Sequence, residues 1–195
     1  METLLRSHEI NQTHNNFIGG WYIDPKVCDY LLNVYNDPRT IKNPGCSADP
    51  DKPNPEIKDS MDAIFNPSEP TIIPYIQQLD LCVKQYVNLY KYCGGTRGFS
   101  LKERINLQHY KVGGGFKEYH CERASSDEFI RDRHLVFMTY LNDLDDGGTE
   151  FYHQKLTIKA EKGLTLIWPV DWTHLHRGQI SHTKEKTITT GWLSF

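Results

Sequence analysis

The stretch from Tyr110 to Glu122, YKVGGGFKEYHCE, holds the first half of a candidate metal site. If its end is extended as in a β-strand, alternate side chains face the same way, so His120 and Glu122 share one face and Cys121 points to the other. Two strand positions separate their Cα atoms by about 6–7 Å. An imidazole and a carboxylate can therefore converge on one ion, and a third ligand must come from elsewhere.

The third ligand is sought in the downstream stretch HLHRGQISHTKEK, residues 174–186. His176 is our candidate, because two histidines and one carboxylate on one face of a metal leave positions open for other ligands of Fe(II). His174 has the same strand parity, so parity alone leaves both histidines open. Lys186 lies in an otherwise apolar strand, where a buried ammonium needs an anionic partner; the alternative is a surface lysine on an edge strand.

Six motifs follow one another in the second half of the chain: Tyr110 with Gly113 to Gly115, His120-Cys121-Glu122, Tyr140-Leu141-Asn142, Gly147 to Phe151, His176-Arg177-Gly178, and Lys186. Together they resemble the 2-oxoglutarate, Fe(II)-dependent oxygenases, most closely the prolyl 4-hydroxylase-like branch. The resemblance covers about residues 100 to 195. It implies a mainly β fold with supporting N-terminal helices, in which a double-stranded β-helix, or jelly roll, holds iron at its open end.

The resemblance also implies roles for individual residues. His120, Glu122 and His176 are expected to bind Fe(II), and Lys186 to pair with the distal carboxylate of 2-oxoglutarate. Tyr140 is expected to be a second hydroxyl donor to that carboxylate, and Tyr110 to line the cosubstrate pocket. Arg133 and Trp192 are expected to lie on the substrate side. The sequence departs from the family at position 122, where aspartate is usual and glutamate stands here.

The activity implied is hydroxylation of a proline in a peptide or protein substrate, using Fe(II), 2-oxoglutarate and O2, with ascorbate as an expected reductant and with release of succinate and CO2. The same chemistry on another amino acid or a small molecule is an alternative. Two further alternatives are a zinc hydrolase, since the same donors can hold Zn²⁺, and a non-catalytic jelly-roll binding module. A hydrolase would give no reason for Lys186.

Length and composition predict one compact domain over residues 1–195, which the resemblance implies is an oxygenase domain, and they leave the oligomeric state open. The chain has 38% hydrophobic residues and a net charge of -3, which lacks the basic excess of a nucleic-acid binder. We expect no membrane association and a cytoplasmic location, because the first residues have no apolar run and no stretch is long enough to span a bilayer. The five cysteines are odd in number and unpaired in spacing, so we expect reduced thiols.

We expect residues 1–99 to supply helical support and a loop, and residues 100–195 to form the jelly roll. Asp24-Pro25 predicts a helix start, and apolar spacing predicts a second helix over residues 71–92. The polar segment 38–60 is expected to be a long loop, either a lid over the active site or disordered. The sheet is expected to begin near Ile105, with further strands within 134–144, 149–153 and 156–169.

Overall fold

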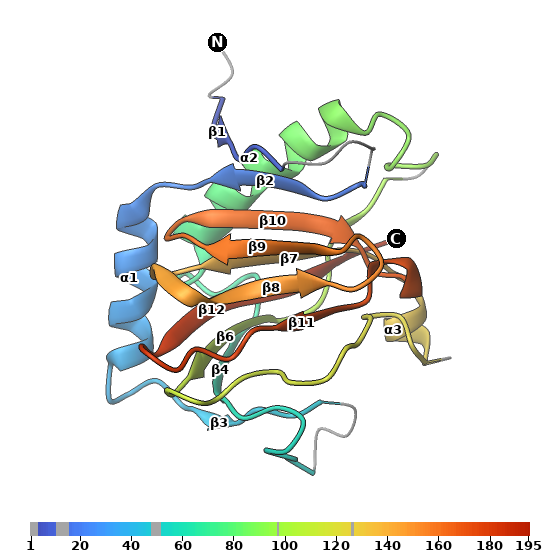
Figure 1. Cartoon of the computed structure of the whole chain (residues 1–195). Coiled ribbons are helices and arrows are strands. Elements are labelled where there is room, and N and C mark those ends of the chain that lie inside the picture. The colour runs from blue at the N-terminus through green and yellow to red at the C-terminus, as the bar shows by residue number, and fades with distance from the viewer. Residues whose placement is uncertain (1–3, 11–15, 48–51, 97, 126) are drawn as a thin grey trace.

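The strands of this computed structural model form two facing antiparallel sheets, and two helices pack near the larger sheet (Figure 1). The structure describes residues 4–10, 16–47, 52–96, 98–125 and 127–195. Two antiparallel sheets packed face to face are the architecture of a jelly roll. The expected mainly β fold with N-terminal helices is confirmed.

The larger sheet has the strand order β1-β2-β10-β7-β12-β6-β4-β3, with β5 also paired to β12. Its strands are β1 (Arg6–Ser7), β2 (Gly19–Tyr22), β3 (Asn43–Pro44), β4 (Met61–Phe65), β5 (Ser100–Leu101), β6 (Ile105–Tyr110), β7 (Arg133–Tyr140), β10 (Leu164–Pro169) and β12 (Lys186–Ser194). The smaller sheet has the order β11-β8-β9, with β8 (Leu144–Phe151), β9 (Leu156–Ala160) and β11 (His176–Gly178).

The expectation that the sheet begins near Ile105 is wrong. β2 pairs with β10, and β4 pairs with β6, so two strands of the N-terminal half lie inside the larger sheet. Both are short, and β2 starts with two glycines, which disfavour a strand by local propensity. Their pairing with distant strands stabilises them, and this pairing cannot be read from local sequence.

The two long helices form where the sequence predicts them. α1 spans Pro25–Asn36, and the Asp24 side chain accepts a hydrogen bond from the Lys26 backbone N–H, as an N-cap should. α2 spans Ile73–Leu89, within the expected range 71–92. A short helix α3 (Glu128–Arg131) and a 3-10 helix η1 (Trp172–His174) lie in the connections between later strands.

Side-chain alternation along the central strands divides the interior into two cores. In β7, Leu135 and Phe137 belong to the core shared with α1 and α2, whereas Val136, Met138 and Tyr140 belong to the core between the two sheets. This is the period of two expected for a strand buried on both faces. The site described below opens from the second core, so strand parity decides which side chains reach it.

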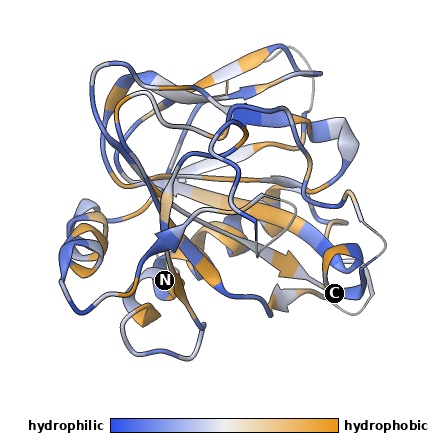
Figure 2. Cartoon of the chain, turned by 90° about the horizontal axis from the view of Figure 1, so that it is seen from below, coloured by the Kyte–Doolittle hydropathy of each residue, from blue (hydrophilic) through white to orange (hydrophobic). Residues whose placement is uncertain are grey.

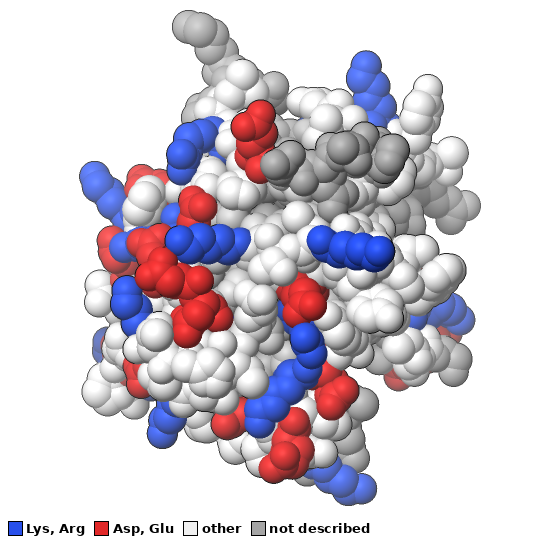
Figure 3. Space-filling model, in the orientation of Figure 1, with Lys and Arg blue, Asp and Glu red and all other residues white. Residues whose placement is uncertain are grey.

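The outer surface carries both signs of charge. Hydrophobic residues gather on the central strands and hydrophilic residues on the surrounding loops in Figure 2. Lysine, arginine and acidic side chains lie next to one another on the face seen in Figure 3. Cys28, Cys82, Cys93 and Cys121 have free thiols. Within the described residues, no helix has the length and apolar character that a membrane crossing requires.

Candidate metal centre and its cavity

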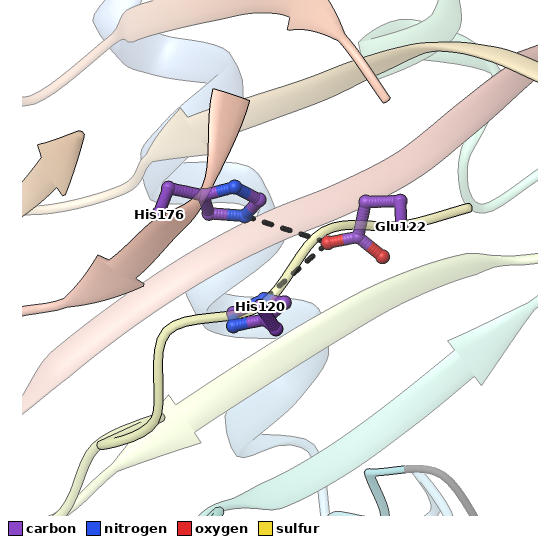
Figure 4. A group of neighbouring side chains, drawn as sticks. All are labelled: His120, Glu122 and His176. Atoms are coloured by element: carbon purple, nitrogen blue, oxygen red, sulfur yellow. Dashed lines mark ion pairs between the residues drawn. The ribbon is translucent and has the colours of Figure 1, made fainter. Parts of the chain in front are cut away.

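His120, Glu122 and His176 converge on one point. Their potential ligand atoms all lie within 4.8 Å of one another. The Oε1 atom of Glu122 is 3.4 Å from Nε2 of His120 and 3.4 Å from Nε2 of His176, and Figure 4 shows both rings directed at this carboxylate. The structure thus brings together the three predicted ligands, with one oxygen and two nitrogens facing a shared space. This donor set suits Fe(II).

Backbone pairing between two distant segments sets this geometry. The N–H of His120 donates to the carbonyl of His176, and the N–H of His176 donates back to the carbonyl of His120, each at 3.0 Å. Two residues further on, the N–H of Glu122 donates to the carbonyl of Val170. Residues 116–122 contain isolated bridges only, so the strand considered for this segment is not regular. Local extended pairing is sufficient to place both ligands on one side.

The imidazole rings are held through their second nitrogens. The Nδ1 atom of His120 lies 3.0 Å from the carbonyl oxygen of Glu118, and Nδ1 of His176 lies 2.9 Å from that of His174. Because a carbonyl only accepts, each Nδ1 carries a proton, and Nε2 is the nitrogen of each ring that faces the position of a metal. Carbonyl partners of this kind orient histidine ligands in metal sites.

The turn before β11 determines that His176, and not His174, lies in the ligand group. His174 ends the 3-10 helix, and its Nε2 lies 2.9 Å from the carbonyl oxygen of Asn16, away from the ligand group. His174 therefore contributes its backbone carbonyl to the orientation of His176. Cys121 is also outside the ligand group, and burial raises the pKa of its thiol, which keeps it neutral.

The protonation states suit a metal site. Burial alone would raise the pKa of the Glu122 carboxyl, but hydrogen bonds and charge from the two imidazoles outweigh burial and hold that pKa well below its usual value. Burial, followed by the nearby His120, lowers the pKa of His176. An ionised carboxylate and a neutral imidazole are the forms that bind a metal.

Lys186 lies in the same cavity and is 3% exposed, which excludes the alternative of a surface lysine. Its Nζ donates to the carbonyl of Gln179 at 2.6 Å and to that of Gly147 at 3.3 Å, and it lies 5.2 Å from the centre of the Tyr110 ring. Burial lowers its pKa to about 8. Among the described residues, no carboxylate forms an ion pair with it. The structure thus presents a buried ammonium with spare hydrogen-bonding capacity.

Two tyrosines line the cavity near Lys186. Tyr140 is buried, and its hydroxyl lies 2.5 Å from Oγ1 of Thr149. Tyr110 is also buried, and its hydroxyl donates to the Gln108 side chain at 2.7 Å. Burial raises the pKa of both hydroxyls, so both are neutral donors at neutral pH. Their predicted roles toward a cosubstrate remain predictions.

Arg133 and Trp192 also line the cavity, but their polar groups contact the protein itself. The Trp192 Nε1–H donates to Oε2 of Glu122 at 3.0 Å. Arg133 donates to the Glu122 backbone carbonyl at 3.2 Å and lies 3.8 Å from its Oε2. Their predicted role on the substrate side therefore remains a prediction. The structure shows in addition that both side chains contact Glu122, a candidate metal ligand.

The cavity has a volume of about 850 Å³ and lies between the sheets. One face of the larger sheet forms its wall, through alternate residues such as Asn106, Gln108 and Tyr110 of β6 and Lys186, Ile188, Thr190 and Trp192 of β12. Segment 38–60 contributes Asn43, Pro44, Cys46, Ser47, Ile57 and Lys58, so its described part covers one side of the cavity; residues 48–51 lie outside the described residues.

Three features of the site were missed by sequence analysis. Phe116 stacks on the ring of His120 with centroids 3.7 Å apart and planes 13° apart. Trp168 packs edge-on against His176. Lys58 and Asp62 form a buried ion pair at 2.6 Å beside the cavity. The spacing of Lys58 and Asp62 is visible in the sequence, but their burial depends on contacts made by a segment that looks like an exposed loop.

A family model matches the part of the chain that contains this site. Residues 105–194 match the family model described as the 2OG-Fe(II) oxygenase superfamily, and these residues contain all three candidate ligands and Lys186. No curated protein matches the sequence.

Solved structures with a similar fold include prolyl hydroxylases. A viral collagen prolyl hydroxylase from Paramecium bursaria Chlorella virus-1, in complex with 2OG, is 21% identical with a TM-score of 0.65, over 91% of this chain and 95% of that chain. A Pseudomonas putida prolyl-4-hydroxylase is 16% identical with a TM-score of 0.66, over 93% of each chain. A Trichoplax adhaerens prolyl hydroxylase in complex with a hypoxia inducible factor peptide fragment is 17% identical with a TM-score of 0.68, over 92% of this chain and 84% of that chain. At these identities the likeness concerns the fold, and it confirms the jelly roll.

Proposed function

We propose that the protein is a 2OG-Fe(II) oxygenase, because residues 105–194 match the model of that superfamily, and that it hydroxylates a proline of a peptide or protein. In this reaction 2-oxoglutarate and O2 are consumed, one oxygen atom enters a C–H bond of the substrate, and succinate and CO2 are released. We also propose that residues 1–195 act as one oxygenase domain, since the larger sheet includes strands from both halves of the chain.

The proposal is supported by the presence, in one cavity, of three side chains that can bind a metal and of one buried cation. His120, Glu122 and His176 point one carboxylate oxygen and two imidazole nitrogens at a common space. Lys186 offers a buried ammonium that forms no ion pair among the described residues, although the more distant charge of Asp146 raises its pKa. A ligand that binds a metal at one end and carries an anion at the other, as 2-oxoglutarate does, satisfies both features.

The chain's own residues would hold and orient the reactants. His120, Glu122 and His176 would bind Fe(II), which when bound supplies the oxidising chemistry with 2-oxoglutarate and O2. Lys186 would pair with the distal carboxylate, and the Tyr140 hydroxyl would donate a hydrogen bond to the same group. Tyr110 and the apolar walls would exclude water from this end of the cavity. Ascorbate is proposed as the external reductant.

The substrate proposal is supported by the connecting segments that line the cavity. They contribute residues of segment 43–47, Ile57 and Lys58, and Ser125 and Ile130 after the ligand pair. The similar prolyl hydroxylases include one in complex with a peptide fragment. A peptide segment would bind across these loops and place one proline ring next to the metal.

The test is succinate formation by the purified protein with Fe(II), 2-oxoglutarate and O2, in the presence and absence of proline-rich peptides. We expect turnover that peptide increases and that His120→Ala abolishes, and a gain on the peptide of the mass of one oxygen atom. His153→Ala is the matched control, because His153 is exposed and outside the ligand group. Stimulation by a free amino acid or small molecule alone would refute the peptide substrate. Absence of both metal and 2-oxoglutarate binding would refute the oxygenase and favour a binding module.

A further inference from the structure

The two oxygens of the Glu122 carboxylate face different partners. Oε1 lies 3.4 Å from Nε2 of each candidate histidine ligand. Oε2 points the other way, accepts a hydrogen bond from Trp192 Nε1 at 3.0 Å, and lies 3.8 Å from the Arg133 guanidinium. One oxygen is thus directed at the metal position, and the other at one hydrogen-bond donor and one guanidinium charge.

Arg133 and Trp192, which face Oε2, are themselves held in place. Arg133 makes two hydrogen bonds to the Glu103 carboxylate, at 2.9 and 2.6 Å, and both side chains are largely buried. Its guanidinium lies 3.5 Å over the Trp192 ring. A paired arginine with stacked geometry is pre-organised, so it loses little conformational entropy when it contacts a further group. Glu103, Arg133 and Trp192 therefore form one connected support behind Glu122.

We infer that Arg133 and Trp192 are positioning residues that orient the Glu122 carboxylate as a one-oxygen metal ligand, and that this support is matched to glutamate at position 122. The inference rests on the proposed function, because it assumes that Glu122 binds the metal. The hydrogen bond from Trp192 and the positive charge of Arg133 hold the outer oxygen away from the metal position, where a second carboxylate oxygen would occupy a site that the cosubstrates need.

The length of the side chain is the reason for the match. Aspartate is shorter than glutamate by one methylene, about 1.5 Å. If an aspartate at position 122 kept its oxygen beside the imidazoles, its other oxygen would move beyond hydrogen-bonding distance of Trp192 Nε1. If it kept the bond to Trp192, it would withdraw from the imidazoles. The residue that is usual in the family is therefore expected to perform worse here than glutamate does.

The test is a double-mutant cycle read as Mn(II) affinity, measured by calorimetry on the protein without cosubstrate. Trp192→Phe keeps the ring stacked on Arg133 and removes only the N–H. We expect it to weaken Mn(II) binding roughly tenfold, as is typical when a partner of a metal ligand is removed. Glu122→Asp should weaken binding by a similar factor, and Trp192→Phe should then add less than about twofold in the Glu122→Asp background.

Controls separate this role from others. Trp172→Phe is the matched substitution, because Trp172 is 67% exposed and does not line the cavity, and it should leave Mn(II) affinity unchanged. Arg133→Met with Arg131→Met as its control tests the second donor, and thermal unfolding checks that each variant folds.

Three results would overturn the inference. Unchanged Mn(II) affinity in Trp192→Phe, with a raised KM for peptide, would assign Trp192 to the substrate alone. An equal loss from Trp192→Phe in the wild-type and Glu122→Asp backgrounds would show a general structural effect. Tighter Mn(II) binding by Glu122→Asp would refute the match to glutamate. In each of these cases the proposed function stands if the wild-type protein binds Mn(II) and 2-oxoglutarate; if it binds neither, the proposed function fails as well.

Discussion

Replacing Lys186 with methionine should abolish most 2-oxoglutarate binding and yet slightly stabilise the protein. The ammonium is 3% exposed, and burial lowers its pKa from 10.5 to about 8. This pKa difference corresponds to about 3 kcal/mol, by which the buried charge lowers the free energy of unfolding at neutral pH. The two hydrogen bonds from Nζ to carbonyl oxygens each stabilise the folded protein by about 1 kcal/mol. Lys186→Met should therefore raise the free energy of unfolding by about 1 kcal/mol, or roughly 2–4 °C in Tm.

The cost to ligand binding should be larger than this gain. A charge-assisted hydrogen bond contributes about 1.5–3 kcal/mol, so Lys186→Met should weaken 2-oxoglutarate binding to the Mn(II)-loaded protein by roughly 10- to 150-fold. The ligand 2-oxopentanoate has a methyl group in place of the distal carboxylate. It should bind weakly and equally to both proteins, which isolates the contribution of the ion pair.

The pH dependence gives an independent check of the same reasoning. Because the pKa of Lys186 is lower in the folded than in the unfolded state, the folded protein binds fewer protons between pH 8 and 10.5, and folding becomes more favourable as pH rises there. The advantage of Lys186→Met in urea unfolding, about 1 kcal/mol, should therefore be full below pH 8 and disappear by about pH 9, because the wild-type protein gains up to about 1.4 kcal/mol per pH unit between pH 8 and 10.5.

Calorimetry and urea unfolding at several pH values measure both effects, with Lys184→Met as the matched control, since Lys184 is exposed on the same segment. The reasoning is refuted if Lys186→Met keeps its 2-oxoglutarate affinity within threefold of wild type. It is also refuted if the substitution lowers the free energy of unfolding while the Lys184→Met control does not.

Three further predictions concern the same cavity. His176→Ala should lower Mn(II) affinity by more than about a hundredfold in calorimetry, whereas His174→Ala, which removes a side chain bonded to a distant carbonyl, should change it less than threefold; equal losses would contradict the ligand assignment. Lys58→Met should cost about 3–5 kcal/mol in urea unfolding because it leaves Asp62 buried and unpaired, and adding Asp62→Leu should recover most of that loss; no recovery would show that packing dominates. For the wild-type protein, 2-oxoglutarate affinity should be flat below pH 8 and fall by up to about tenfold per pH unit above it, since the free Lys186 loses its proton there; a flat profile to pH 9.5 would argue against the ammonium.

The sequence by itself determined the parts of this protein that depend on local chemistry. The cap at Asp24 and the proline after it fix the start of α1, because both act within one helical turn. The spacing of His120 and Glu122 places both side chains on one side of an extended segment, and a lysine in an apolar stretch indicates a buried charge. The family resemblance of residues 100–195 then gave the fold, and the match of residues 105–194 to the oxygenase family agrees with it.

Only the tertiary structure decided features that depend on pairing between distant segments. His174 and His176 are equivalent by parity, and the 3-10 helix before β11, with the backbone pairing of His176 to His120, brings only His176 to the site. β2 and β4 have weak local signals and become strands because their partners in the sheet supply the hydrogen bonds. The contact of Trp192 with Glu122 joins residues 70 positions apart in sequence, and no local pattern encodes such a distance. Its physical cause is the position of β12 in the centre of the larger sheet, which carries Lys186 and Trp192 to opposite parts of one cavity.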